Sequence, residues 1–267
     1  MIILILVIIL LGVYLFALHG RRNHKGLRAL RGRAYAHRGL HGNGVPENSM
    51  AAFRLALEKG YGIELDIHLM KDGKLAVIHD ASLKRTAGAD VKIEDLTAED
   101  LKNYRLEGTD EQIPLFTDVL ELFSGKSPMI VELKAERNNH AALCKAACEV
   151  LESYDGAYCM ESFDPRCIRW LKANKPDIVR GQLAENYWVS KTRLPWYLEL
   201  VLTAHLLNFL TVPDFIAYNF KDRKRLGTFL CRKLWGIQGV AWTIQTQEDF
   251  DAAVTEGWIP IFEGFEP

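Results

Sequence analysis

Short apolar runs alternate with helical patterns along the chain from residue 33 onward. The runs that read as strands lie at 33–37, 62–69, 75–79, 129–133, 157–161, 178–183, 215–219 and 239–243. Apolar residues at helical spacing fill most of the intervals, at 49–59, 117–123, 141–153, 165–174, 196–208, 223–234 and 247–256. Such alternation is typical of parallel βαβ units. The pattern predicts an α/β fold in which eight strands close a TIM (β/α)8 barrel, with an open doubly wound sheet as the alternative.

Two segments depart from this rhythm. Residues 81–114 are polar and rich in acidic side chains, and they predict a small insertion after the third strand. Residues 196–210 are unusually apolar, with the sequence WYLELVLTAHLLNFL. We expect a barrel helix packed on its neighbours there, because apolar helices in large domains usually belong to the core. The alternative is a surface helix that rests on a membrane.

The N-terminal segment is apolar on every side. Residues 2–18 carry no charge, and at about 1.5 Å per residue they form a helix slightly shorter than a bilayer core of about 30 Å. Residues 1, 19 and 20 extend it, so we predict a transmembrane anchor over 1–20. A cleaved signal peptide is the main alternative, but no basic region precedes the run and no small-residue cleavage site follows it. A buried core helix is less consistent with a run that has no polar face.

Basic residues follow the apolar run without an intervening acid: Arg21, Arg22, Lys25, Arg28, Arg31 and Arg33. Basic flanks of a single span stay on the cytoplasmic side. The sequence therefore predicts a single-pass protein of the cell membrane, with a basic juxtamembrane linker at 21–32 and a cytoplasmic catalytic domain at 33–267. The same cluster could meet anionic headgroups, each residue contributing about 1 kcal/mol near the surface.

The amino-acid composition mainly excludes certain classes of protein. The 267 residues include 33 Lys and Arg against 34 Asp and Glu, for a net charge of −1, and 49% are hydrophobic. These values exclude a disordered chain or a strongly basic nucleic-acid-binding protein. The five cysteines are odd in number and lack a C-x-x-C motif, so neither a disulfide framework nor a zinc site is indicated. Nothing in the sequence indicates a protein partner.

Candidate chemistry begins on the strand at 62–69. Because side chains alternate along a strand, Glu64, Asp66 and His68 share the face opposite to the apolar residues. Buried carboxylates are costly unless a cation compensates them, and a hard divalent metal does so with oxygen ligands. If the strand at 129–133 belongs to the same parallel barrel, Glu132 joins Glu64 and Asp66 at the carboxyl ends of the strands. Lys134 follows two residues later on the same face. An ion-paired polar layer inside the sheet is the structural alternative to a metal site.

Histidines end two further strands. His37 precedes Arg38 at the end of the first predicted strand, and His79 ends the third. Strand ends form the active-site face of a barrel, and imidazoles titrate near neutrality, so one can accept a proton while the other donates one. With Arg38 and Lys134 as cations for phosphate oxygens, the constellation predicts phosphodiester cleavage.

The stretch from Ala36 to Gly88 resembles the glycerophosphodiester phosphodiesterase (GDPD) family. It contains H-R-G, P-E-N-S, E-x-D and K-D-G-x-x-x-V-x-H-D elements in order, and later pieces around 130–134, 161–164 and 241–243 also look like the family. The resemblance implies a TIM barrel with an insertion and a metal-dependent hydrolase that releases sn-glycerol 3-phosphate and an alcohol. The implied cofactor is one divalent cation, Mg²⁺ or Ca²⁺, with Mn²⁺ as a further candidate.

The resemblance also implies roles for individual residues. Metal ligands would be Glu64, Asp66 and Glu132, acid–base residues His37 and His79, and phosphate contacts Arg38 and Lys134. The remaining matches are Glu47 near the mouth, with Phe163 and Trp242 lining the alcohol side of the pocket. Asn48 or Ser49 could instead cap the following helix. Gln245 stands where the family often has Asn, which affects the expected substrate-side contacts.

Three functions follow as alternatives. The first is hydrolysis of small glycerophosphodiesters, the second is a lysophospholipase D-type reaction on membrane lipid diesters, and the third is a membrane-tethered barrel that binds headgroups without turnover. For the reaction, we assign the base to His37, because Arg38 beside it would lower its pKa. His79 is then the acid, although strand alternation directs the adjacent Asp80 away from it.

Overall fold

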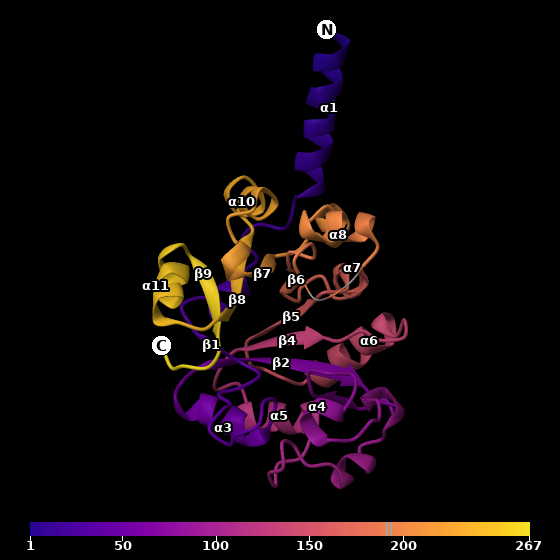
Figure 1. The fold of residues 1–267 in the computed structure, drawn as a ribbon, viewed down its shortest axis with the longest axis vertical. Coiled ribbons are helices and arrows are strands. Elements are labelled where there is room, and N and C mark those ends of the chain that lie inside the picture. Colours follow the sequence, from indigo (N-terminus) through magenta and orange to yellow (C-terminus); the bar gives the residue numbers. More distant parts are fainter. Residues whose placement is uncertain (191, 193) are drawn as a thin grey trace.

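The computed structural model describes residues 1–190, 192 and 194–267. Within them, eight parallel strands form a closed barrel, and the pairing of β1 with both β2 and β9 completes the ring (Figure 1). In barrel order the strands are β1 (Tyr35–His37), β9 (Trp258–Phe262), β8 (Gln238–Ile244), β7 (Phe215–Asn219), β6 (Arg180–Ala184), β5 (Tyr158–Ser162), β4 (Met129–Leu133) and β2 (Gly62–Leu69). The predicted TIM-type barrel is confirmed, and the open sheet is excluded.

Two strand assignments from the sequence are wrong. The run expected as the third barrel strand is β3 (Leu75–Val77), which pairs antiparallel with β2 outside the ring. A turn at residues 70–74 links them, and so short a connection allows only an antiparallel pair. The eighth barrel strand is β9, which the sequence analysis missed. The insertion consequently follows the second barrel strand rather than the third.

Helices cover the outside of the ring. They are α3 (Met50–Glu58), α5 (Phe116–Phe123), α6 (His140–Leu151), α7 (Pro165–Asn174), α8 (Trp196–Thr203), α9 (Asn208–Thr211), α10 (Leu226–Lys233) and α11 (Gln247–Thr255). The backbone N–H of Ala52 donates to Ser49 Oγ at 3.1 Å, so Ser49 is the N-cap of α3. Ile63, Leu65 and Ile67 of β2 pack outward against such helices, which leaves the polar residues of that strand facing the barrel interior.

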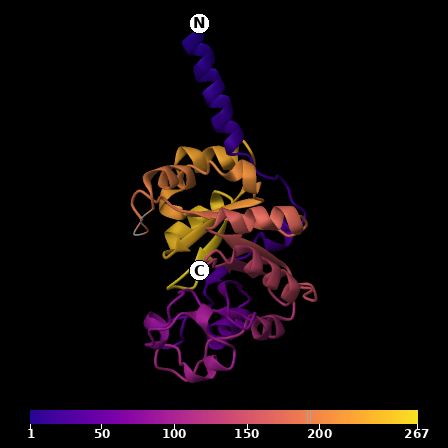
Figure 2. The same ribbon diagram turned by 90° about the vertical axis from the view of Figure 1, so that its right-hand side faces the viewer.

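The insertion forms a small lobe with its own apolar cluster. It contains α4 (Lys84–Ala87) and two short 3-10 helices, η1 (Ile93–Asp95) and η2 (Asp100–Asn103). Its centre is built from Met70, Ile78, Leu83, Ile93, Leu101, Leu106 and Ile113. Figures 1 and 2 show this lobe at the end of the molecule opposite to α1.

The N-terminal helix is shorter than the sequence predicted. Helix α1 covers Ile2–Ala17, which is 16 residues or about 24 Å. Among the described residues, no helix combines the length and apolarity needed to cross a membrane. The helix stops because the chain turns into the domain: Leu18 is fully buried against Ile216 and Ile237, and Trp235 Nε1 donates to the Leu15 carbonyl at 2.9 Å. The predicted transmembrane helix over 1–20 is thus corrected.

Residues 21–32, expected as a basic linker, contribute to the barrel core. They contain α2 (Leu27–Leu30), whose Leu27 and Leu30 are buried with Tyr35, Phe215 and Ile259. Arg21 pairs with buried Asp214 just before β7. This short helix closes the barrel end at which the strands begin.

The apolar segment 196–210 is not the packed barrel helix that we expected. It divides into α8 and α9, separated by His205 with a left-handed backbone (φ 57°). Thr203 is the buried residue of α8, whereas Trp196, Tyr197 and Leu200 are exposed by 75%, 52% and 41%. This helix therefore presents aromatic and aliphatic side chains to the outside.

Candidate active site

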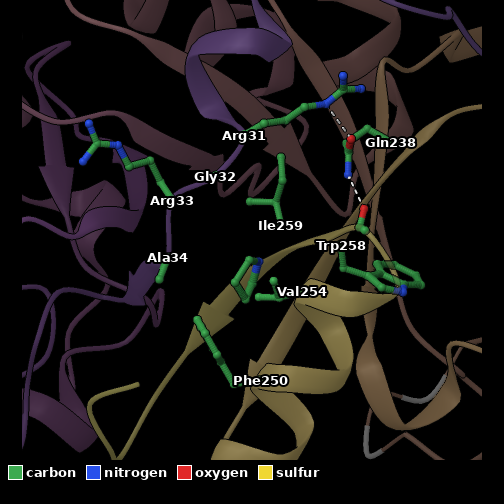
Figure 3. A pocket seen from close by; sticks show the side chains of 11 residues that line it. Arg31, Gly32, Arg33, Ala34, Gln238, Phe250, Val254, Trp258 and Ile259 are labelled. Atoms are coloured by element: carbon green, nitrogen blue, oxygen red, sulfur yellow. Dashed lines mark hydrogen bonds between the residues drawn. The ribbon is translucent and has the colours of Figure 1, made fainter.

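The two ends of the barrel are lined by different chemistry. At the end where the strands begin, a cavity of about 440 Å³ lies between residues 31–34 and the elements α11, β8 and β9 (Figure 3). It is lined by Arg31, Arg33, Phe250, Trp258 and other residues, with no carboxylate among the described lining. At the opposite end, a smaller cavity of about 130 Å³ is lined by both predicted histidines and by Glu64 and Glu132. The candidate site is therefore at the carboxyl ends of the strands, as in other barrels.

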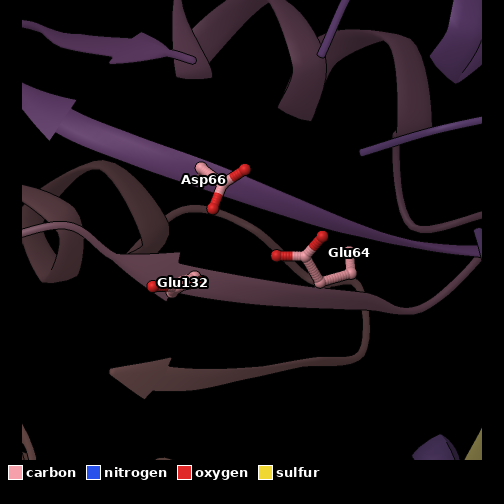
Figure 4. A group of neighbouring side chains, drawn as sticks. All are labelled: Glu64, Asp66 and Glu132. Atoms are coloured by element: carbon pink, nitrogen blue, oxygen red, sulfur yellow. The ribbon is translucent and has the colours of Figure 1, made fainter. Parts of the chain in front are cut away.

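Three carboxylates meet at this mouth (Figure 4). Glu64 and Asp66 come from β2, Glu132 comes from β4, and one oxygen from each lies within 4.8 Å of the others. The strand register aligns Asp66 directly with Glu132. All three side chains are buried, as the alternation along β2 and β4 predicted. Their oxygen atoms form the donor set that a hard divalent cation prefers.

The charges of this cluster are only partly balanced by protein groups. Burial, followed by the nearby charges of Asp66 and Glu132, raises the pKa of Glu64 well above its usual range. Burial also raises the pKa of Glu132 to about 7, despite Lys134. Asp66 is the exception: burial opposes its ionisation, but Lys134 and other cations outweigh it and hold its pKa well below the usual value. The carboxylates thus favour one more positive charge at their centre.

Lys134 and Arg38 supply the protein's own cations. Lys134 Nζ lies 2.9 Å from Asp66 Oδ1 and 2.7 Å from Glu132 Oε1, so part of the predicted ion-paired layer is present. Arg38 Nη1 donates to Glu47 Oε1 at 2.9 Å, and its buried Nε has no hydrogen-bond partner among the described atoms. Asn48 Nδ2 donates to Asp66 Oδ2 at 2.8 Å, so Asn48 belongs to the site and not to the helix cap.

A fourth carboxylate lies beside the three. Glu161 of β5 pairs in register with Glu132, lines the same cavity and is buried. Burial and the charge of Glu132 raise its pKa well above the usual range, and its Oε2 has no partner among the described residues. Glu161 belongs to the family-like piece at 161–164 but was not among the predicted site residues.

His37 is held by a residue that the sequence analysis missed. Its Nδ1 lies 2.5 Å from Glu263 Oε2, and Glu263 directly follows β9. The hydrogen bond from His37 lowers the pKa of Glu263 to about 2, so Glu263 is a carboxylate that can only accept. His37 therefore donates from Nδ1, and its Nε2 faces the cluster, 3.9 Å from Glu64 Oε2.

His79 has the same arrangement with a different partner. Its Nδ1 lies 2.6 Å from Asp80 Oδ1, and Arg85 Nε donates to Asp80 Oδ2 at 2.6 Å. The expectation that Asp80 points away was wrong, because β3 ends at Val77 and strand alternation no longer applies at residues 79 and 80. Burial lowers the pKa of His79 to about 4.

The insertion reaches the site through two links. Arg85 of α4 donates to Glu47 from both Nη1 and Nη2, at 3.0 and 2.7 Å. His68, the third polar residue on the inner face of β2, pairs through Nδ1 with Glu94 of η1 at 2.7 Å. Its Nε2 lies 3.2 Å from the His79 carbonyl oxygen. The insertion thus holds both Glu47 and the backbone of His79.

Two aromatic rings form the other wall of the cavity. Phe163 and Trp242 pack edge to face, with ring centroids 5.7 Å apart, and both line the same cavity as the two histidines. Gln245 lies beyond the end of β8, is exposed and does not line it. The presence of Gln instead of Asn at residue 245 therefore does not alter the lining of this pocket.

Comparison with known proteins agrees with this geometry. The model of the glycerophosphoryl diester phosphodiesterase family matches residues 37–262. A glycerophosphodiester phosphodiesterase of Caldanaerobacter subterraneus subsp. tengcongensis is 29% identical over 235 residues, which cover 83% of this chain and 89% of that protein. A lysophospholipase D of Rattus norvegicus is 35% identical over 150 residues, but these cover 51% of this chain and 45% of that protein.

Two solved structures share the fold. The phosphodiesterase of Oleispira antarctica, in complex with the product sn-glycerol-3-phosphate, has a TM-score of 0.71 at 24% identity and covers 86% of this chain and 92% of its own. A putative glycerophosphoryl diester phosphodiesterase of Silicibacter pomeroyi has a TM-score of 0.73 at 20% identity, covering 90% and 94%.

Proposed function

Because this chain belongs to the glycerophosphoryl diester phosphodiesterase family, we propose that it hydrolyses glycerophosphodiesters to sn-glycerol 3-phosphate and an alcohol. The observation that carries the proposal is the cavity at the barrel mouth, which both carboxylate-bound histidines, Arg38, Glu64 and Glu132 line, with Asp66 and Lys134 directly in contact with these carboxylates. Each group has a defined task in breaking a phosphorus–oxygen bond.

The charged residues act on the phosphate. Glu64, Asp66 and Glu132 would hold one divalent cation, Mg²⁺ or Ca²⁺, with Mn²⁺ as a further candidate. When bound, such an ion offsets the negative charge that develops on the phosphate oxygens. Arg38 and Lys134 add fixed positive charge to the same oxygens, and the spare hydrogen-bonding capacity of Arg38 Nε supports this role. Glu47 positions Arg38 and so acts indirectly.

The histidines move protons. Each imidazole donates from Nδ1 to its own carboxylate, which leaves Nε2 for the reacting groups. We assign His37 as the base that accepts the proton of the attacking oxygen as this oxygen forms its bond to phosphorus. His79 is the acid: burial lowers its pKa to about 4, but the negative charge of a bound phosphodiester favours the imidazolium, whose Nε2 donates a proton to the departing alkoxide as its bond to phosphorus breaks. Phe163 and Trp242 would contact the alcohol side of the substrate.

A metal requirement is the first test of this function. Chelation with EDTA should reduce hydrolysis of bis(p-nitrophenyl) phosphate to background, because the carboxylate cluster then lacks its compensating cation. Re-addition of Mg²⁺, Ca²⁺ or Mn²⁺ in separate assays should restore activity and rank the ions. Turnover that persists unchanged in chelator would contradict a metal-dependent hydrolase. The absence of turnover under every condition would favour a headgroup-binding barrel without catalysis.

A second test identifies the alcohol group that the substrate carries. A lysophospholipase D-type reaction has support from the lysophospholipase D of Rattus norvegicus that is similar to half of this chain. Glycerophosphocholine and lysophosphatidylcholine, offered at equal concentration with analysis of the released choline, distinguish the two substrate classes. We expect glycerophosphocholine to be cleaved. A higher kcat/KM for lysophosphatidylcholine would instead identify lipid diesters as the preferred substrate class.

We also propose that the barrel lies on the cytoplasmic side of the cell membrane. The exposed basic residues after α1, among them Arg22, Lys25 and Arg28, support this side because the cytoplasmic leaflet carries the anionic lipids that attract basic residues. Protease added to intact cells should leave the barrel uncut, and the same protease should cut it once the cells are permeabilised. Cleavage in intact cells would reverse the assignment.

A further inference from the structure

Exposed apolar side chains gather around the base of α1. Helices α8 and α10 lie at the end of the molecule from which α1 projects, in both views (Figures 1 and 2). Phe16 of α1 packs against Phe209 of α9, with ring centroids 6.1 Å apart. Helices α8, α9 and α10 expose several large apolar residues, and so does the end of the chain segment just after α10. They are Trp196, Tyr197 and Leu200 on α8, Phe209 on α9, Leu226 and Phe229 on α10, and Leu234 after it. Exposed apolar side chains gathered at one end of a molecule indicate an interaction site there.

Helix α1 itself has no polar side. None of the residues 2–13 is charged or carries a polar side chain, and Ile2, Leu6 and Ile9 are exposed by 73%, 53% and 54%. A helix that is apolar all round is stable only where apolar material surrounds it. A second copy of this chain would cover one stripe of the helix and leave the other sides in water. Hydrocarbon is the medium that covers every side at once.

Unpaired cations border the same surface. Lys224, Arg225 and Lys233 flank the exposed apolar residues of α10, and all three are exposed. Arg22 lies against Gly236 just after α10. Among the described residues, none of these four side chains lies within 4.0 Å of a carboxylate. Positive charge beside exposed aromatic and aliphatic side chains is the complement of an anionic lipid surface.

We propose that α1 and the outward faces of α8, α9 and α10 form one docking surface for an anionic lipid bilayer. Helix α1 enters the hydrocarbon without crossing it, the aromatic residues of α8 and α10 lie at the level of the headgroups, and the four cations meet lipid phosphates. The contacts of Leu15 and Leu18 with the domain join α1 to this face as one unit. The proposal is independent of the reaction at the barrel mouth.

Vesicle flotation of the full chain tests the contributions of α1 and the cations. Wild type should float with vesicles of phosphatidylcholine and phosphatidylserine. Changing Leu6 and Ile9 together to Asp should weaken partition at least about 100-fold, because charged residues are excluded from hydrocarbon. Changing Lys224, Arg225 and Lys233 to Gln should cost about fivefold per residue at low salt, and less at high salt. Lys102→Gln and Lys145→Gln, on exposed cations elsewhere, serve as matched controls.

A fluorescent label distinguishes docking of the whole face from anchoring by α1 alone. Phe229 on α10 and Val254 on α11 are exposed by 51% and 53%, and the five native cysteines are all buried. An environment-sensitive dye on Phe229→Cys should shift to the blue when anionic vesicles are added. The same dye on Val254→Cys, outside the face, should not shift.

Three results would overturn the proposal. Equal dye responses at 229 and 254 would mean that α10 does not reach the bilayer. Failure of the wild-type chain to bind anionic vesicles would exclude a lipid surface. Dimers in sedimentation that the Leu6 and Ile9 changes dissociate, with vesicle binding unaffected, would make a second copy the occupant of the face.

Discussion

Glu64→Gln is expected to lower kcat at least about 10³-fold, because the substitution removes one charged metal ligand while keeping its shape. The fold should be as stable as wild type or more stable. Burial first, and then the neighbouring carboxylates, raise the pKa of Glu64, so a neutral amide relieves both the desolvation of a charge and the repulsion there. The measurement is turnover of glycerophosphocholine with saturating divalent cation, paired with thermal unfolding of the same preparation.

The matched control is Glu121→Gln, the same chemical change on the exposed surface of α5. It should leave both activity and unfolding unchanged. Near-normal turnover of Glu64→Gln with restored metal would remove Glu64 from the ligand set. Lost activity together with a large drop in unfolding temperature would instead assign the carboxylate to folding.

His79→Ala is expected to discriminate between leaving groups. An alkoxide is a poor leaving group and needs a proton, whereas nitrophenolate leaves without one. The variant should therefore lose about 10³-fold on an alkyl diester and less than about tenfold on a nitrophenyl diester. His37→Ala removes the base and should reduce both substrates by about 10³-fold. Steady-state kinetics of the two variants on both substrates give the comparison.

The carboxylate partners provide graded variants. Asp80→Asn and Glu263→Gln keep both imidazoles but weaken their orientation, so each should reproduce the substrate pattern of its own histidine at smaller size. If His37→Ala is the selective variant, the two roles are exchanged. Equal losses for both histidine variants on both substrates would exclude any division of labour.

Local patterns were sufficient to predict the carboxylate cluster. Period-two alternation alone assigned Glu64 and Asp66 to one face of β2, and parallel pairing then aligned Glu132 with Asp66. Glu263 could not be found in this way, because it lies 226 residues from His37 in the sequence. Its strand was missed too: β9 contains Pro260, which lacks the N–H of a regular strand residue. Long-range partners depend on closure of the ring, which no local pattern encodes.

Hydropathy located the N-terminal helix but not its end. Residues 2–18 are equally apolar along their length, yet Leu18 is fully buried in the domain while Ile2 and Leu10 are exposed. Apolar character does not distinguish a contact with protein from a contact with lipid. The same ambiguity affected residues 196–210, where apolar residues predicted core packing and the chain presents several of them outward. Only the tertiary contacts separate the two cases.

The short helix α2 restricts how the barrel can move relative to α1. Leu18 is fixed at one end of the connection and Leu27 at the other, and Arg21 is paired between them. A flexible tether would let the barrel tumble through a wide range of orientations above a surface. This connection instead fixes the orientation of the barrel relative to α1, and so the tilt and height of the barrel mouth above the surface. Once the docking surface is bound to a bilayer, the barrel mouth would stay at a constant height above it. Diffusion of the protein along the bilayer would then bring the mouth to other membrane-bound molecules by a two-dimensional encounter.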